Sequence, residues 1–159
     1  MGMIWLEISD KRCTPLALDD KMQHSKLGVS FTATTRSIKV SVNATWLPRE
    51  SDPSQDRYFW RYDIEITNEG GETVQLMTRH WIIIDGHGHR KEVRGDGVIG
   101  EQPKLLPGAT FNYASGTPLA TDTGFMQGTY HMITDTGEGF DVEIPAFSLD
   151  SPYQDRRVN

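Results

Sequence analysis

Apolar and polar residues alternate with a period of two over several short segments of this chain. The run Ile38–Trp46 places apolar residues at every second position, and the run Tyr58–Thr67 does the same with bulkier side chains. A shorter run spans Val29–Ala33. Successive side chains of a β-strand point to opposite faces, so this alternation is typical of a sheet with one buried and one solvated face. The pattern predicts β-strands.

Clusters of glycine, asparagine and proline separate these segments. Asn68–Glu72, Leu106–Gly108 and Asp135–Gly139 are turn signals, because Gly and Asn tolerate the positive φ of tight reversals. The strands expected beyond Thr67 are Trp81–Ile84, Arg90–Arg94, Ala109–Tyr113, Phe125–Ile133 and Phe140–Ile144. Short strands at intervals of roughly 8–12 residues, without helical periodicity, predict an all-β, immunoglobulin-like or fibronectin-III-like sandwich of about seven antiparallel strands.

We expect the sandwich to occupy residues 26–149. Residues 1–25 lack a clear period and form an expected N-terminal arm, with a short helical turn near Leu16–Met22. Residues 150–159 form an expected C-terminal tail. A chain of 159 residues suits one domain of this kind.

Charge and composition exclude several classes of protein. The net charge of −6 argues against general nucleic-acid binding, which requires a basic face. The single cysteine, Cys13, rules out an internal disulfide framework and fits a reducing compartment. No apolar run approaches the ~20 residues of a membrane span. We therefore expect a cytoplasmic protein with no membrane segment.

A glycine-rich segment follows the expected strand Arg90–Arg94. Gly95, Gly97 and Gly100 match the spacing GxGxxG of dinucleotide-binding proteins. That motif requires a helix after its last glycine, whose N-terminal amides hold the pyrophosphate. Pro103 and Pro107 follow closely, and a helix interior does not accept proline. The sequence therefore predicts a β corner in place of a nucleotide-binding helix.

Two interpretations of the glycine segment remain open. In the first, the glycines supply positive φ and close strand approach at a corner. In the second, consecutive amides of Gly95, Gly97 and Gly100 form an anion-binding nest. Arg94, Arg79 or Lys91 would then lie near enough to hold a phosphate. His80 is a further candidate, either bonded across strands or part of a surface site, whereas Trp81 is expected in the core and Arg79 outside it.

No residue pattern indicates catalysis. His87 and His89 flank a turn without further ligands at zinc-site spacing, so no metal site is predicted. The chain has no GxSxG motif, and Cys13 has no evident histidine partner. Asp141 and Glu143 fall on the outward positions of a strand and are expected to be solvated. His131 is isolated in the sequence and receives no role. The sequence predicts a protein that is not an enzyme and needs no cofactor.

Several long motifs occur in an order that resembles the ApaG family. The motifs are VQLMTRHWIIID (Val74–Asp85), EVRGDGVIGEQPKLLPG (Glu92–Gly108), FNYASGTPL (Phe111–Leu119), MQGTYHM (Met126–Met132) and FDVEIPAFSL (Phe140–Leu149). The resemblance covers about residues 29–149. It implies a fibronectin-III-like sandwich, in agreement with the strand pattern.

The resemblance also implies what such a protein does. Members of the family have been linked to cobalt and magnesium resistance, and similar domains occur in larger eukaryotic proteins, which favours a protein partner. The first hypothesis is therefore a non-enzymatic binding or protein-interaction module. The alternative is binding of a small phosphorylated ligand, such as pyrophosphate or a dinucleoside polyphosphate, or of a divalent metal. The residues that would hold this ligand are Gly95, Gly97, Gly100, Arg94, Arg79 and His80.

Overall fold

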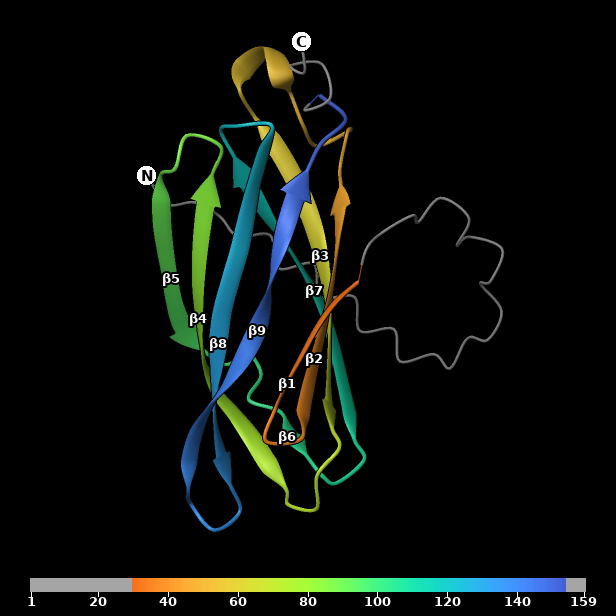
Figure 1. Ribbon diagram of the computed structural model, residues 1–159, viewed down its shortest axis with the longest axis vertical. Helices are drawn as coiled ribbons and strands as arrows, with labels where there is room; N and C mark the ends of the chain where they lie inside the picture. The colour runs from red at the N-terminus through yellow and green to blue at the C-terminus, as the bar shows by residue number, and fades with distance from the viewer. Residues whose placement is uncertain (1–29, 154–159) are drawn as a thin grey trace, which may run out of the picture.

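Two antiparallel sheets pack face to face in the computed structural model, which describes residues 30–153 (Figure 1). The β7 sheet has the order β1-β2-β3-β7, and the β4 sheet has the order β5-β4-β8-β9, with β6 also paired to β4. The strands of the β7 sheet are β1 (Phe31–Thr35), β2 (Ile38–Trp46), β3 (Tyr58–Asn68) and β7 (Thr110–Leu119). Those of the β4 sheet are β4 (Val74–Asp85), β5 (Arg90–Asp96), β6 (Lys104–Leu105), β8 (Thr123–Thr134) and β9 (Gly139–Asp150). The loop between β2 and β3 contains one short 3₁₀ turn, Pro53–Gln55.

The period-two pattern places the core where the sequence predicts it. Alternate residues of β3 from Tyr58 to Ile66 are buried between the sheets, as are Val40 and Val42 of β2. Aromatic rings connect the two layers, since the Tyr62 and Trp81 ring centroids lie 5.4 Å apart. The predicted all-β, fibronectin-III-like sandwich is confirmed. The strands outnumber the expected total partly because β6 has only two residues.

The last strand is longer than the sequence predicts. β9 continues past Pro145 to Asp150. Ile144 and Pro145 are both buried, so the alternation shifts by one residue there and resumes with Phe147 and Leu149 buried. Proline cannot donate to a ladder, but β9 is an edge strand, where this costs no pairing on the outer side. The pairing of β8 with β9 shifts register between Met126 and Gly128. The expected N-terminal arm and its helical turn lie outside the described residues.

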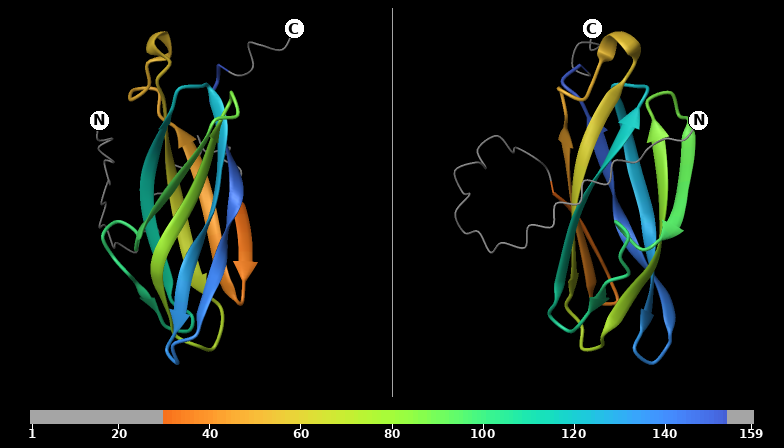
Figure 2. Two further views of the ribbon diagram at one scale, coloured as in Figure 1. Left: turned by 90° about the vertical axis from the view of Figure 1, so that its left-hand side faces the viewer. Right: turned by 180° about the vertical axis from the view of Figure 1, so that it is seen from behind.

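One side of the sandwich is closed by side chains. The amide of Glu143 on β9 donates to Thr35 Oγ1 on β1. Arg36 pairs with Glu138 at 2.8 Å and lies over the Phe140 ring, 4.5 Å from its centroid. On the opposite side, β5 and β7 are the sheet edges, and Figure 2 (left) looks onto that side. The two sides of the molecule are therefore unequal.

The chain that follows β5 crosses the lower part of the open side. The Leu76 amide donates to Pro103 O, β6 then pairs with β4, and the chain passes to β7 in the other sheet. Asn68 fixes this crossing from a fully buried position. Its amide nitrogen donates to Glu72 O and Leu105 O at 2.7 and 2.9 Å.

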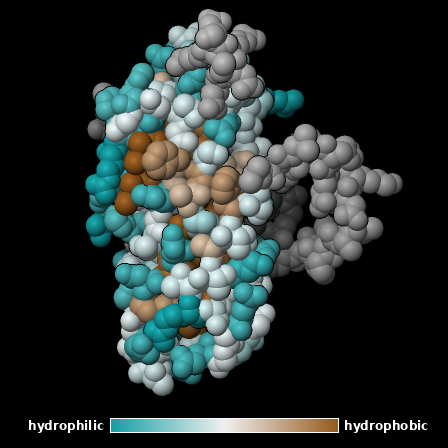
Figure 3. Space-filling view, in the orientation of Figure 1, coloured by the Kyte–Doolittle hydropathy of each residue, from teal (hydrophilic) through white to brown (hydrophobic). Residues whose placement is uncertain are grey.

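The outer face of the β4 sheet carries a small apolar patch. Hydrophobic residues gather in the upper half of this face, over β4 and β8 (Figure 3). Ile82 and Ile84 are half-buried there, and Phe125 is 40% exposed. No helix in residues 30–153 has the length and apolar character needed to cross a membrane.

Candidate functional site

The glycine segment forms a tight β corner. Val98 and Glu101 exchange two backbone hydrogen bonds at 2.8 and 2.9 Å. The two residues between them, Ile99 and Gly100, have φ of 44° and 75°, as in a type I′ turn. At Gly97, with φ of 61°, a Cβ would lie 2.2 Å from Glu101 O. No helix leaves Gly100, so the predicted corner is confirmed.

The amides of this corner are largely used within the fold. Gly97 N donates to Met77 O at 2.8 Å, and Val98 N donates to Glu101 O. An anion nest requires successive N–H groups that point together at a ligand. The first interpretation, a structural corner, accounts for these contacts directly.

Arg79 turns towards the interior, contrary to the outward orientation expected from the sequence. It lies two residues before the buried Trp81 and so shares its face of β4. Arg79 Nη1 donates to Asp96 O at 3.0 Å and to Gly97 O at 2.7 Å. The absence of a side chain at Gly95 makes room, because a Cβ there would lie 3.0 Å from the guanidinium.

His80 and Arg94 lie on the other face of the sheet. They are cross-strand partners, and both surround the carboxylate of Glu92 together with Arg90. His80 Nε2 lies 3.2 Å from Glu92 Oε2, and Arg90 Nη2 lies 2.6 Å from Glu92 Oε1. The hydrogen bond with His80 and the charge of Arg90 hold the pKa of Glu92 below its usual value. The candidate residues are thus divided, with Arg79 and Gly95 inside and His80 and Arg94 outside.

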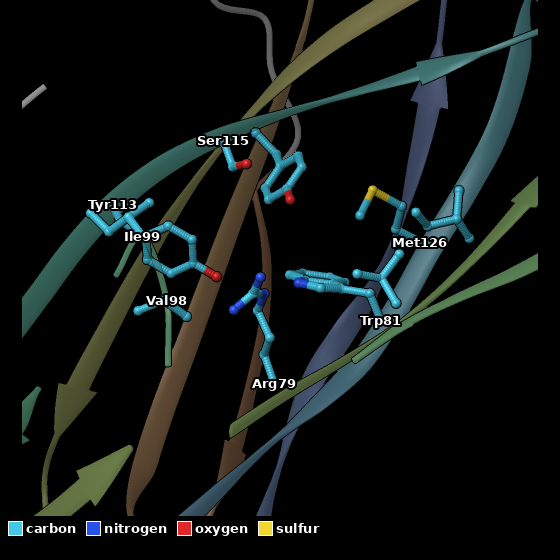
Figure 4. Close-up of a pocket in the computed structure, with 10 residues that line it drawn as sticks. Arg79, Trp81, Val98, Ile99, Tyr113, Ser115 and Met126 are labelled. Carbon is cyan, nitrogen blue, oxygen red and sulfur yellow. The ribbon is translucent and has the colours of Figure 1, made fainter. Parts of the chain in front are cut away.

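A small cavity lies between the sheets on the open side (Figure 4). Its volume is about 50 Å³. Figure 4 shows the Arg79 guanidinium pointing into it, with Trp81 and Met126 on one side and Tyr113 and Ser115 on the other. The lining residues are Tyr62, Arg79, Trp81, Ile83, Val93, Val98, Ile99, Tyr113, Ser115 and Met126. The cavity is therefore apolar with one cationic wall.

Two buried tyrosines support the polar end of the cavity. The hydroxyls of Tyr113 on β7 and Tyr130 on β8 are hydrogen-bonded at 2.5 Å. Burial raises the pKa of both phenols well above the usual value, so both stay neutral. No role was predicted for either tyrosine from the sequence. The available signal was that Tyr113 and Tyr130 occupy inward positions of alternating strands, where a hydroxyl needs a partner.

A wider recess continues from the cavity along the open side. Ile83 lines both spaces, and the recess measures about 370 Å³. Its lining residues are Asp56, Ile83, Asp85, His89, Arg90, Lys91, Thr117, Pro118, Leu119 and Ala120. We call the cavity and the recess together the side groove. It runs between the edge strands β5 and β7.

The remaining histidines of residues 30–153 take part in local surface contacts. Asp85 Oδ1 accepts hydrogen bonds from the amides of His87 and His89, each at 2.9 Å, which closes the β4–β5 turn. His131 Nδ1 lies 2.9 Å from the exposed Asp141 on β9, a pair that the sequence did not predict. Within residues 30–153, no group of three or more His, Cys, Asp or Glu side chains is arranged to hold a metal ion.

Comparisons with known proteins agree with the fold. A family model described as the ApaG domain matches residues 48–134. Protein ApaG of Bradyrhizobium diazoefficiens is 53% identical over 129 residues, which cover 81% of this chain and 99% of the relative. Protein ApaG of Rhodospirillum centenum is 54% identical with the same coverage. A crystal structure of a protein named ApaA from Bordetella pertussis has a TM-score of 0.72 and 47% identity, covering 76% of this chain and 98% of that one. This chain belongs to the ApaG domain family.

Proposed function

We propose that this protein is a cytoplasmic, non-enzymatic interaction module that binds a partner protein at the side groove. The small size of the apolar cavity at the Arg79 end of the groove carries the proposal, and the recess of about 370 Å³ beside it leaves room for the chain that bears the entering side chain. Small-molecule sites commonly span roughly 300–1,000 Å³, whereas this cavity measures about 50 Å³. A space of this size and apolar lining accepts part of one side chain, as an anchoring residue of a protein partner requires.

The chemistry of the cavity also favours binding over catalysis. The polar groups of the cavity are the Arg79 guanidinium, the Ser115 hydroxyl and the phenols of Tyr62 and Tyr113. Proton transfer is carried out most often by an imidazole or a carboxylate, and the cavity lining contains neither. Burial raises the pKa of the Tyr113 phenol, so this group stays protonated. Any link to cobalt or magnesium resistance would then be indirect and act through the partner.

An affinity pull-down from a cytosolic extract tests this proposal, with three forms of the chain as bait. Val93→Arg places a cation in the cavity, and Phe125→Ser removes the most exposed side chain of the apolar patch on the outer face. We expect a partner to copurify with the wild type and with Phe125→Ser, and to be depleted at least tenfold with Val93→Arg. Far-UV circular dichroism checks that both variants fold.

Other outcomes separate the parts of the proposal. Loss of the partner with Phe125→Ser alone would move the interaction to the outer patch. The absence of any protein enriched over an unrelated β-sandwich bait would contradict the interaction module itself. We also expect no turnover of nucleotides by the purified chain. Hydrolysis that disappears with His80→Ala or Arg94→Ala would refute a non-enzymatic role.

One observation supports a second function, the binding of a small phosphorylated ligand. His80, Arg90 and Arg94 gather around Glu92 on the outer face of a chain whose net charge is −6. We propose, as the alternative, that a small phosphorylated ligand binds beside the glycine corner by displacing the Glu92 carboxylate. Arg79, on the inner face, would act only by holding the carbonyls of Asp96 and Gly97.

Calorimetric titration with pyrophosphate, diadenosine tetraphosphate, Mg²⁺ and Co²⁺ tests the alternative. Glu92→Gln removes the competing carboxylate and should strengthen pyrophosphate binding, whereas Arg94→Ala should weaken it. No heat from the wild type or from Glu92→Gln would rule the phosphate site out. Heat from the cations alone would point to a metal site.

A further inference from the structure

Strand β7 is an edge strand of its sheet among residues 30–153. Its ten residues pair with β3 from Tyr58↔Leu119 to Thr67↔Thr110. Among the strands of residues 30–153, β7 pairs with β3 alone. The strand Thr110–Leu119 contains no charged residue. An edge strand presents a row of N–H and C=O groups that can pair with another chain, and proteins usually blunt such edges with charge, proline or short length.

The other three edges carry such protection. β5 bears Arg90, Lys91, Glu92 and Arg94. β9 bears acidic residues and an internal proline, and β1 has five residues and contacts β9 through Thr35. On β7 the one blunting residue is Pro118, next to the end of the strand. Strand β7 is therefore the edge best suited to accept another strand.

The cavity lies directly beside the open edge of β7. Tyr113 and Ser115 line the cavity from β7, and Trp81 and Val93 line it from the β4 sheet. A strand added to β7 would lie about 4.8 Å further along the sheet. Its alternate side chains would face the β4 sheet, because side-chain direction alternates along a strand. One of these inward side chains would enter the cavity.

The positive charge of Arg79 favours an acidic residue in such a strand, close to the residue that enters the cavity. Arg79 is held by two carbonyls, and no ion pair within the described residues gives it a carboxylate. Lys91, Arg90 and His89 line the recess, together with the acidic residues Asp56 and Asp85. The Asp85 carboxylate accepts hydrogen bonds from the amides of its own turn. The cavity end of the groove thus complements one acidic side chain.

We propose that β7 accepts an extended segment of a partner protein as a fifth strand of its sheet. One apolar side chain of the segment fills the cavity beside Trp81, and a carboxylate two residues away on the same face meets Arg79. Main-chain pairing then supplies affinity, and the inward pockets supply specificity. This inference rests on the proposed interaction function and states which strand and which chemistry it uses.

A second copy of this chain fits the groove less well. In any register, a second β7 strand would bring no carboxylate to Arg79, because Thr110–Leu119 contains no Asp or Glu. In the symmetric register its Tyr113 would lie at the cavity, and the Tyr113 hydroxyl is bonded to Tyr130 in its own sandwich.

The test uses a random decapeptide library displayed on phage and selected against the intact chain. We expect enriched peptides with apolar residues at alternate positions and Asp or Glu on the same face. A synthetic peptide of the leading sequence should slow hydrogen exchange of alternate β7 amides at least tenfold, measured by NMR, and leave β1 unchanged.

Changes in the peptide avoid any effect on folding of the protein. N-methylation of the peptide amides that pair with β7 should weaken binding at least tenfold, whereas N-methylation of the intervening amides should not. Replacing its acidic residue with the amide should weaken binding to the wild type, and much less to Arg79→Gln. This double comparison assigns the carboxylate to Arg79.

Three outcomes would overturn strand addition. Protection of β7 amides in the free protein that grows with its concentration would assign the edge to a second copy. Peptides that bind without protecting β7 would leave an interaction module that uses another surface. Failure to enrich any peptide would end the strand proposal, while the pull-down with Val93→Arg judges the module independently.

Discussion

Ile99 has an unfavourable backbone conformation at a position beside the cavity. Its φ of 44° is rare for a β-branched residue, because the side chain crowds the backbone there. Backbone strain of this kind costs on the order of 1–3 kcal/mol and persists where the surrounding structure fixes it. Ile99 lines the cavity. The strain is therefore consistent with an isoleucine that is retained because its side chain forms part of the cavity wall.

Ile99→Asn tests this balance. The change creates Asn-Gly, the favoured type I′ pair, and removes one half-buried apolar side chain. We expect the free energy of unfolding to stay within about 1 kcal/mol of the wild type, because relief of strain offsets lost burial. Urea denaturation measures it, with Ile83→Asn as the control that should lose far more. A loss as large as that of the control would contradict strain at Ile99.

Asn68→Ala should destabilise the crossing between the sheets. The substitution removes the donor to Glu72 O and Leu105 O from a fully buried site. Unsatisfied buried groups cost about 1–3 kcal/mol each. We therefore expect a loss of roughly 2–4 kcal/mol in urea denaturation. A loss as small as that of an exposed control, Asn112→Ala, would show that water replaces the side chain.

The residues found in turns and at strand ends explain why the β1–β2 hairpin and the end of β9 were hard to predict from the sequence. The β1–β2 hairpin turns through Arg36 and Ser37, with φ of 47° and 66°. Neither residue is a usual type I′ choice, so the sequence showed a break between two strands without showing a hairpin. The continuation of β9 past Pro145 was missed for a related reason. Proline ends a central strand, and nothing local shows that β9 lies at an edge.

Ser37→Gly should stabilise this hairpin. A left-handed conformation costs a non-glycine residue about 1–2 kcal/mol, and the greater freedom of unfolded glycine offsets about 0.5–1 kcal/mol. We expect a net gain of about 0.5 kcal/mol and a small rise in Tm. Thr34→Gly, within β1, should lower Tm instead. A fall in Tm with Ser37→Gly would contradict the strain assigned to this turn.

The β4–β5 turn should give the fold an acid-sensitive point. Burial tends to raise the pKa of Asp85, but the amides and imidazoles of His87 and His89 outweigh it, so the pKa lies below its usual value of 3.8. A lowered carboxyl pKa stabilises the folded chain above the unfolded-state pKa. This stability is lost as the pH falls below about 4 and through the folded-state pKa.

Melting curves between pH 6 and pH 2 check the role of Asp85. We expect Tm of the wild type to fall over the acid range, and Asp85→Asn to fall less steeply from a lower starting value. Parallel curves for the two proteins would show that Asp85 does not contribute to acid sensitivity.

The sandwich has one closed side and one open side. Inner strands such as β3 and β8 have neighbours on both sides, whereas β5 and β7 have one. Local opening is easiest where fewest contacts hold the backbone. We expect amide hydrogen exchange to be slowest in β3 and β8 and faster on the outer edge of β7. Uniform protection across β3 and β7 would indicate that another chain already covers the edge.

The sequence predicts the sandwich well and its groove poorly, for a physical reason. Burial of alternate residues is a local pattern, so strands such as Tyr58–Thr67 and the corner after Gly97 were correctly expected. The groove depends on which strands become edges and on how the sheets face each other. Arg79 illustrates the difficulty, because its inward direction follows from Trp81 two residues later, yet its charge suggested solvent. Arg79 faces inward and still has room for its charged guanidinium because its cross-strand partner is Gly95.

Residues 79 and 95 depend on each other, because the Arg79 guanidinium occupies the space that a side chain at residue 95 would use. A methyl group at residue 95 would lie 3.0 Å from the guanidinium, so Gly95→Ala should require that side chain to move by a few tenths of an ångström while Arg79 is present, and no movement once residue 79 is short. Such pairs are strongly non-additive. Among descendants of this sequence, a side chain at residue 95 should therefore occur more often where residue 79 is short than where it is arginine.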